Sequence, residues 1–370
     1  MSQLHQILVG DCIDMMRTLP DESVHTCVTS PPYYGLRDYG VDGQIGLEET
    51  PAEFIARLVD VFREVRRVLR ADGTMWLNMG DSYAGSWGAQ GRPQGDGQMS
   101  GRSVTSARQI NEHPRFKSGT GVRGREMDMK PKDLMGMPWR LAFALQDDGW
   151  YLRQDIIWHK PNPMPESTRD RCTKAHEYMF LLSKSRQYFY DQDAIKEPVS
   201  ASSIARLAQN VYDQAGSDRV PGKANGPMKA VRSRRDSFKR EGSKREQVIP
   251  GQTVGTHRPD RTDSDYPLDM RNKRSVWSVP TVGYKGAHFA TFPPDLIRPC
   301  ILAGSPRGGM VLDPFGGAGT TSLVSMQEGR RSIICELNPE YAALARARID
   351  SAWLDGAAQM DVFRDTPPAA

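Results

Sequence analysis

The residues best suited to chemistry form the tetrapeptide Ser30-Pro31-Pro32-Tyr33, which follows the apolar-leaning run 24–28. If that run is a strand, Ser30 lies at its carboxyl end, and the working crevice of an open α/β sheet lies outside those ends. Two successive prolines fix φ and remove two backbone donors, which leaves rigidly aimed carbonyl acceptors. A hydroxyl, a fixed carbonyl and an aromatic ring together suit a flat base that carries an amino group.

A second motif lies near the other end of the chain, where the strand-like run 309–313 ends in Asp313 and a glycine turn follows it. The order of strand, turn, helix, strand and second acid indicates half of a nucleotide-binding α/β sheet. Glu336 follows Asp313 by 23 residues, close to the roughly 20 residues that place an acid on a ribose hydroxyl. The turn lacks both the GxGxxG pattern and a P-loop lysine, so phosphates are not the obvious ligand.

The first half of the chain contains the elements that would position the tetrapeptide. Residues 6–9 predict a short buried strand that runs into Gly10 and Asp11. Two interpretations of Asp11 stay open, since it could cap the next helix or face a pocket at the end of a strand. A capping box at 50–53 begins an amphipathic helix that ends near 71–73, and 74–78 predict the next strand. These elements form a β-α-β unit.

The later elements follow the same alternation. Residues 138–146 predict a helix, and 151–158 predict a strand. The segments 177–182 and 187–190 are expected to form a hairpin. A final helix is expected to begin at Asn338 and Pro339.

Two long segments interrupt this alternation. Residues 84–130 lack an apolar period and carry many arginines, so they are either a clamp that orders on a polyanion or a solvated linker. Residues 194–279 are polar, with a basic cluster between 229 and 245 that is typical of phosphate-backbone contacts but also of a solvated linker. The residues predicted to bind DNA are Lys229, Arg232, Arg234, Arg235, Lys239 and Arg240.

Composition narrows the class of protein. The 49 Lys and Arg residues against 45 Asp and Glu give a formal charge of only +4, so a polyanion site must come from local clustering. Five scattered cysteines without metal-type spacing argue for a reducing compartment and against a structural zinc. The sequence shows neither a membrane-spanning apolar run nor a signal peptide, and a cytoplasmic protein is expected.

Together these motifs resemble the DNA amino-methyltransferases that use S-adenosylmethionine, in the permuted group whose catalytic motif precedes the cofactor motif. The resemblance covers most of residues 5–190 and 275–350. It implies a Rossmann-like α/β fold, with a mostly parallel twisted sheet flanked by helices and an inserted target-recognition region. It also implies that Ser30, Pro31, Pro32 and Tyr33 are the catalytic residues, and that no metal is used.

The resemblance assigns the cofactor site residue by residue. The ribose acid corresponds to Glu336 and the adenine-contacting acid to Asp11, while Phe292 belongs to a stretch that helps to enclose the methionine part. Ala318 stands in the glycine turn where the family often has Ser. The residues predicted to bind S-adenosylmethionine are Asp11, Phe292, Asp313, Pro314, Phe315, Gly316, Gly317, Gly319, Thr320, Thr321, Glu336 and Asn338.

The same resemblance predicts the organisation of the chain. Residues 1–195 would form the catalytic half of the methyltransferase domain, with 84–130 as a mobile basic loop. Residues 196–279 would recognise the target, 280–355 would form the cofactor-binding half, and 356–370 would be a tail.

The expected chemistry is methylation of an exocyclic amino group. Its nitrogen is a poor nucleophile because the lone pair is conjugated into the ring. The Ser30 hydroxyl and the Pro31 carbonyl would accept hydrogen bonds from the amino group and pull its nitrogen toward tetrahedral geometry. Tyr33 would stack on a base flipped out of the duplex, and in-line proximity to the methyl donor would carry much of the rate. Methylation at carbon 5 would need a cysteine nucleophile, whereas Cys300 is expected to be a core residue.

Ser in the first position of the tetrapeptide is associated in the family with cytosine N4, and adenine N6 is the alternative. An RNA or protein-amide methyltransferase, a non-catalytic DNA-binding protein and a nicotinamide oxidoreductase remain as competing classes. The glycine pattern disfavours the last of these. Double-stranded DNA is the expected partner, with a homodimer and a companion restriction endonuclease left open and no membrane contact expected.

Overall fold

The computed structural model describes residues 4–35, 41–84, 129–130, 132–200, 270–281 and 292–354 of the 370-residue chain. The chain divides into two compact units, residues 1–195 with 274–370 and residues 196–273. In the described part of the second unit, strands β6 (Glu197–Pro198) and β7 (Met270–Arg271) pair in antiparallel fashion. An ion pair of 3.0 Å joins Arg271 to Glu197 across this pair.

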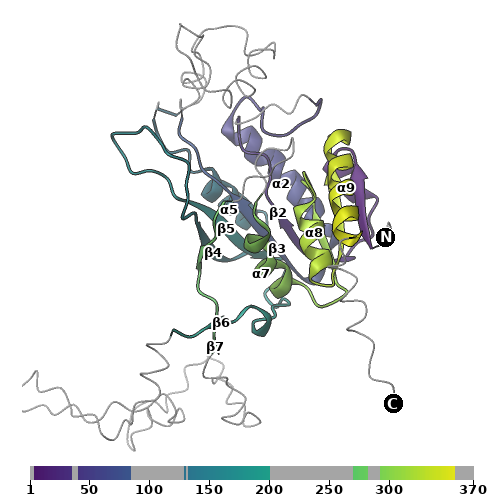
Figure 1. The fold of residues 1–370 in the computed structure, drawn as a ribbon. Helices are drawn as coiled ribbons and strands as arrows, with labels where there is room; N and C mark the ends of the chain where they lie inside the picture. Colours follow the sequence, from purple (N-terminus) through teal and green to yellow (C-terminus); the bar gives the residue numbers. More distant parts are fainter. Residues whose placement is uncertain are drawn as a thin grey trace, which may run out of the picture. The chain divides into compact units, whose positions relative to one another are not determined.

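The first unit is built on an eight-stranded sheet in the order β1-β10-β9-β2-β3-β5-β4-β8 (Figure 1). Only β5 runs antiparallel to its two neighbours, β3 and β4, so the sheet is mostly parallel and the predicted fold class is confirmed. The strands are β1 (His5–Val9), β2 (Val24–Thr29), β3 (Leu69–Met79), β4 (Tyr151–His159), β5 (His176–Ser183), β8 (Val276–Ser278), β9 (Met310–Asp313) and β10 (Arg331–Glu336).

Helices cover both faces of this sheet. Helices α1, α2 and α5 share one core with side chains such as Cys27 and Met75, whereas α7 packs on the opposite face against Val28 and Trp76. Because neighbouring residues on a strand point to opposite faces, these adjacent pairs separate into the two cores. The helices are α1 (Cys12–Arg17), α2 (Pro51–Val68), α5 (Met137–Asp147), α7 (Pro294–Gly304), α8 (Thr320–Gln327) and α9 (Pro339–Leu354).

Helix α2 shows how the local sequence sets an element. The Thr50 hydroxyl accepts a hydrogen bond from the Glu53 amide at 3.1 Å, and the Glu53 carboxylate accepts one from the Thr50 amide at 3.2 Å. This confirms the predicted capping box. The stripe that includes Phe54, Leu58 and Phe62 is fully buried, and each such side chain contributes roughly 1.5–3 kcal/mol relative to an exposed one.

Two sequence-based expectations are wrong in detail. Helix α2 ends at Val68, before the expected 71–73, because Leu69 already adopts extended backbone angles and begins β3. The expected hairpin is absent: β5 lies between β3 and β4, and residues 187–190 form no strand. Both faces of β5 are buried through its apolar residues, so it pairs with distant strands rather than with the next segment of the chain.

Other features of the described residues follow expectation. Cys300 is fully buried in the core on α7, as predicted. Cys12, Cys27 and Cys335 are also buried and free. Within the described ranges, no helix is long and apolar enough to cross a membrane.

Candidate active site

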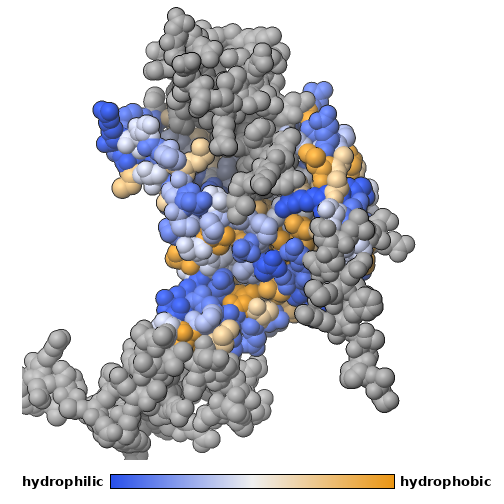
Figure 2. Space-filling view, in the orientation of Figure 1, coloured by the Kyte–Doolittle hydropathy of each residue, from blue (hydrophilic) through white to orange (hydrophobic). Residues whose placement is uncertain are grey.

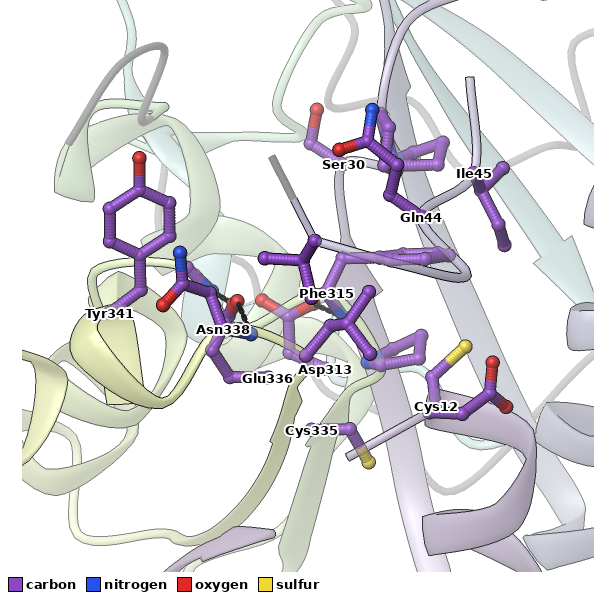
Figure 3. Close-up of a pocket in the computed structure, with 18 of the residues that line it drawn as sticks. Cys12, Ser30, Gln44, Ile45, Asp313, Phe315, Cys335, Glu336, Asn338 and Tyr341 are labelled. Carbon is purple, nitrogen blue, oxygen red and sulfur yellow. Dashed lines mark hydrogen bonds between the residues drawn. The ribbon is translucent and has the colours of Figure 1, made fainter. Parts of the chain in front are cut away.

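The two chemical motifs meet at one edge of the sheet. Strands β1, β10, β9 and β2 are neighbours and run parallel, so their carboxyl ends lie side by side. Asp11, Ser30, Asp313 and Glu336 follow or end these strands, and all four line one pocket. Figure 3 shows Ser30 and Gln44 across the pocket from Asp313, Glu336 and Asn338.

Asp313 holds the glycine turn in place. Its Oδ1 accepts hydrogen bonds from the Thr29 hydroxyl at 2.7 Å and from the Phe315 amide at 3.0 Å, and its Oδ2 accepts one from the Thr321 hydroxyl at 2.6 Å. Burial raises the pKa of Asp313 to about 6, although these donors act in the opposite direction. The carboxylate therefore joins the end of β2 to the turn.

Glu336 is bound by the backbone of the same region. Its Oε2 accepts from the Gly317 amide at 2.8 Å, and its Oε1 accepts from the Asn338 amide at 2.9 Å. Burial raises the pKa of Glu336, while these backbone donors lower it. The carboxylate lines the pocket beside Phe315 and Leu337.

The glycines of the turn have steric roles. A Cβ on Gly316 would lie 2.8 Å from the Cβ of Ile334 on β10, so only glycine allows this close approach. Gly317 and Gly319 have φ values of 51° and 74°, in the left-handed region that favours glycine. The turn can therefore pass tightly over β10 and leave the pocket open above it.

Asp11 satisfies both interpretations that the sequence left open. Its Oδ1 caps α1 by accepting from the Ile13 amide at 2.9 Å, and its Oδ2 pairs with Arg57 at 3.4 Å. The residue also lines the pocket. Its predicted contact with the adenine of the cofactor stays a prediction.

Tyr33 is fixed by residues from three other strands or their ends. Its hydroxyl donates to Oε2 of Glu177 at 2.9 Å, and Nδ2 of Asn78 reaches the same oxygen at 3.4 Å. Lys160 forms an ion pair with Glu177 through the other oxygen, Oε1. Burial and the charge of Glu177 raise the pKa of Tyr33 well above its ordinary value, whereas a side-chain hydrogen bond with Ser30 lowers it.

Gly80 leaves the space that this arrangement needs. A Cβ at that position would lie 2.9 Å from Cε2 of Tyr33 and 3.1 Å from the carboxyl carbon of Glu177. We define Tyr33, Glu177, Lys160 and Asn78 as the tyrosine network. It fixes the orientation of the ring next to Ser30.

Most of the predicted site residues share the pocket. Ser30–Tyr33 line it, as do all the predicted cofactor residues except Gly319 and Thr321. Gly319 is the N-cap residue of α8, and Thr321 binds Asp313 from behind the turn. The predicted DNA-binding residues, Lys229, Arg232, Arg234, Arg235, Lys239 and Arg240, lie outside the described residues, as does nearly all of the predicted loop 84–130.

Sequence reasoning missed part of the pocket wall. Gln44 and Ile45, from the segment between β2 and α2, line the pocket, as does Tyr341 on α9. The buried Ile45 lies in the run Gly43-Gln44-Ile45-Gly46 of a connecting segment, and an apolar residue among these glycines was an available signal. Tyr341 lies in the helix that the sequence predicts to begin at Asn338 and Pro339, and nothing in a helical pattern indicates that it lines a pocket.

The residues present fit the nucleoside part of S-adenosylmethionine. Glu336, whose carboxylate accepts from two backbone amides, lines the same pocket as the apolar side chains of Phe315, Leu337 and Ile45. Such pockets combine mostly apolar walls with a few oriented polar groups. Glu336 retains lone pairs for ribose hydroxyls, and the apolar walls suit a flat base.

Sequence comparison identifies a family and close relatives. A family model with the description "N6_N4_Mtase: DNA methylase" matches residues 24–347. The Type II methyltransferase M.XycI of Xanthomonas campestris pv. cyanopsidis is 42% identical over 340 residues, covering 92% of this chain and 86% of that protein. M.SmaI of Serratia marcescens, also a Type II methyltransferase, is 42% identical over 344 residues, covering 93% and 90%.

Comparison with solved structures concerns the fold. The cytosine-N4-specific PvuII DNA methyltransferase aligns with a TM-score of 0.52 at 16% identity, over 95% of this chain and 92% of that chain. TTHA0409 of Thermus thermophilus, described as a putative DNA modification methylase complexed with S-adenosyl-L-methionine, aligns with a TM-score of 0.50 at 20% identity, over 94% and 95%. Both share the architecture described above.

Proposed function

This chain belongs to the N6_N4_Mtase family of DNA methylases, and we propose that it methylates the exocyclic N4 of a cytosine flipped out of duplex DNA. The observation that carries the proposal is that Ser30 and the glycine turn share one pocket. Ser30 holds the first position of the catalytic tetrapeptide, where the resemblance associates Ser with cytosine N4. The PvuII enzyme, a cytosine-N4-specific DNA methyltransferase, has the same fold.

The cofactor is S-adenosylmethionine, in agreement with the sequence prediction and with family membership. When bound, it supplies a methyl group on a positively charged sulfur. Glu336 is placed to bind the ribose, and Asp11 and Phe292 line the same pocket. Asp313 acts indirectly, because its two carboxylate oxygens are engaged by Thr29, Phe315 and Thr321.

The residues on the Ser30 side prepare the amino group. The Ser30 hydroxyl and the Pro31 carbonyl accept hydrogen bonds from its two N–H groups and draw the nitrogen toward tetrahedral geometry, which frees its lone pair. The lone pair then attacks the methyl carbon in line while the carbon–sulfur bond breaks, and the methylated nitrogen afterwards gives up one proton to water. Tyr33 stacks on the base, and the tyrosine network holds the ring by its hydroxyl. Orientation of this kind supplies a large part of the rate in two-reactant chemistry.

Product analysis tests the proposal directly. The full chain is incubated with duplex DNA and S-adenosylmethionine that carries a tritiated methyl group, and the DNA is digested to nucleosides. Label in N4-methylcytosine is the expected result. Label only in N6-methyladenine would overturn the cytosine assignment and leave DNA methylation standing, and transfer to RNA but not to DNA would overturn the substrate class.

The relatives extend the proposal to a biological context. M.XycI and M.SmaI carry the name Type II methyltransferase, so we place this chain in a restriction-modification system with a companion endonuclease. DNA methylated by this enzyme should then resist that endonuclease, and unmethylated DNA should be cut. A homodimer stays a prediction, to be tested by sedimentation of the full chain with and without DNA.

We assign target recognition to the region 196–279, most of which belongs to the second unit. The cluster 229–245 is rich in Lys and Arg, and each phosphate that it neutralises adds to the salt dependence of binding. Deleting these residues should weaken DNA binding and flatten its dependence on salt. Unchanged DNA affinity would remove the cluster from the interface. β8, at the end of the predicted range, instead pairs with β4 in the main sheet.

A further inference from the structure

We propose that Met164, on the loop between β4 and β5, inserts into the DNA duplex at the place that the flipped base leaves. This inference rests on the proposed function, since it takes duplex DNA as the substrate. The loop comprises residues 160–175 and is called the β4–β5 loop below. It projects from the sheet as the teal hairpin of Figure 1.

Met164 is a long apolar side chain left in water. It is 86% exposed, the largest fraction among the exposed large hydrophobic residues of the described ranges, and it belongs to none of the core clusters. Pro163 and Pro165 flank it, and Pro161 lies three positions before it. Because proline fixes φ, the backbone on both sides of Met164 is stiff.

The loop is anchored to the first unit on both sides of its tip. Asn162 exchanges two hydrogen bonds with the backbone of Thr281, at 2.9 and 3.1 Å. On the other side Arg171 pairs with Glu166 at 2.5 Å, and its guanidinium lies 4.0 Å from the ring centre of Tyr83. These contacts fix the loop on both sides of Met164, whose own side chain stays exposed.

The loop rises from the edge of the sheet that carries Ser30. The pairing register places Thr29 beside Leu77, Leu77 beside Phe180, and Phe180 beside Asp155. β4 runs parallel to β2 and continues four residues past that level to His159, a rise of about 13 Å. DNA that presents a base to Ser30 must lie over this edge, and the β4–β5 loop extends on that side.

A chain of polar contacts connects the loop to the catalytic tetrapeptide. Lys160, the first residue of the loop, pairs with Glu177, and Glu177 accepts from the hydroxyl of Tyr33 at 2.9 Å. The position of the loop is thus tied to the ring that is expected to stack on the flipped base. Insertion of Met164 into the duplex and stacking of Tyr33 on the flipped base would therefore be coupled through the tyrosine network.

The charge of the loop suits a nucleic acid. It carries four basic residues, Lys160, Arg169, Arg171 and Lys174, against the two acids Glu166 and Asp170. The projecting part is mostly hydrophilic in Figure 2, and Arg169 is exposed. An apolar side chain among basic residues is typical of proteins that push a wedge between base steps while they contact phosphates. Because Lys160 and Arg171 are held in ion pairs with Glu177 and Glu166, the exposed Arg169 is the side chain of the loop placed to reach a phosphate.

The test compares paired and mispaired targets. Met164→Ala should lower methyl transfer to a fully paired duplex by roughly tenfold or more, because the side chain that fills the place of the flipped base is lost while the cost of unpairing that base remains. On a duplex whose target cytosine is mispaired, the same variant should approach wild-type activity, because a base already unpaired costs less to flip. Phe143→Ala is the matched control, since Phe143 is 51% exposed on α5, and it should leave transfer unchanged on both substrates.

Two further variants test whether transfer depends on the apolar character of residue 164 rather than on a general disturbance of the loop. Met164→Leu keeps an apolar wedge and should restore transfer, whereas Met164→Gln should behave like Met164→Ala. An equal loss on paired and mispaired DNA, or no loss at all, would overturn the inference. If the wild-type chain transferred no methyl group to either duplex, the proposed function itself would be overturned, and the inference with it.

Discussion

The two sides of the pocket are built in different ways. On the cofactor side, Asp313 and Glu336 are bound mainly by amides and hydroxyls from the glycine turn and its neighbours, such as Phe315 and Gly317. On the base side, Tyr33 is fixed through Glu177, a residue 144 positions away in the chain. The first side is encoded mostly within the turn and its neighbours, with one distant donor, the Thr29 hydroxyl on Asp313. The second side exists only once distant strands have paired.

This difference predicts that the two sides fail differently. A change on the cofactor side should disturb the turn and cofactor binding together, because the same groups serve both. A change on the base side should spare cofactor binding and lower transfer, because the tyrosine network supports only the orientation of the base. The following substitutions test that separation.

The largest effect is expected for Ser30→Ala. Loss of one of the two acceptors of the amino group should lower transfer by about a hundredfold or more, as for other groups that act on the developing charge. Cofactor affinity should stay within about twofold, since Ser30 is proposed to contact the base rather than the cofactor. Calorimetry measures that affinity. Lost cofactor binding with the remaining transfer rate unchanged would contradict the proposed separation.

The second effect is expected for Asp313→Ala. It removes the acceptor of the hydroxyls of Thr29 and Thr321 and of the Phe315 amide, and each buried donor left without a partner costs about 1–3 kcal/mol. The turn should loosen, and cofactor affinity should fall at least about tenfold. Calorimetry measures the affinity, and thermal unfolding reports whether the whole chain remains folded.

Glu336→Gln is the comparison that sharpens this result. It keeps the shape of the side chain and an acceptor for the Gly317 amide, but it loses the negative charge and turns an NH2 group toward the Asn338 amide. If Asp313 acts by holding the turn and Glu336 acts by touching the ribose, Asp313→Ala leaves three donors without an acceptor and Glu336→Gln leaves one, so Asp313→Ala should lower the free energy of unfolding without cofactor by the larger amount. Equal destabilisation by both changes would reject this division of roles.

A third, smaller effect tests the base side by a double-mutant cycle. Tyr33→Phe removes the hydroxyl that donates to Glu177, and Glu177→Gln removes the charge that Lys160 and Tyr33 share. Each should lower kcat by about tenfold, and the double variant should be little worse than either one, because coupled residues are not additive.

The KM for S-adenosylmethionine should change little in these variants. Asp60→Asn, on α2, breaks an ion pair with Arg63 whose residues do not line the pocket, and it serves as the control. Fully additive losses in the double variant would show that Glu177 supports something other than the Tyr33 ring.

The same contrast explains what the sequence could predict. The glycine turn, Asp313 and Glu336 lie within 24 consecutive residues, so the pattern of strand, turn, helix and strand predicted them together. The β-α-β unit around α2 was equally accessible, because a capping box and a helical period are local signals.

The tyrosine network could not be predicted in this way. Asn78, Lys160 and Glu177 come together because β5 inserts between β3 and β4, and nothing in the local pattern of 177–182 shows which strands it will join. The erroneous hairpin and the missing network have this one cause. Gln44 and Ile45 were missed because they lie in a connecting segment without a period, where only the tertiary fold places a side chain at the pocket.

The smallest effect isolates the charge of Asp313. Its folded-state pKa of about 6 lies above the ordinary value of 3.8, so the folded state favours the protonated carboxyl. This contribution to the free energy of unfolding is greatest below the unfolded-state pKa. The contribution is lost as the pH rises from the unfolded-state pKa through the folded-state pKa. Above the folded-state pKa, Asp313 no longer makes the free energy of unfolding depend on pH.

Asp313→Asn removes the titration but keeps the size of the side chain. Its oxygen still accepts from Thr29 and Phe315, and the Thr321 hydroxyl can rotate to accept from its NH2 group. Relative to the wild type, the variant should therefore gain about 1 kcal/mol in the free energy of unfolding between pH 5 and pH 8. Urea unfolding of both proteins at the two pH values measures this difference. A difference that stays constant would mean that Asp313 carries its charge without penalty, and the turn would then be held by charge as well as by hydrogen bonds.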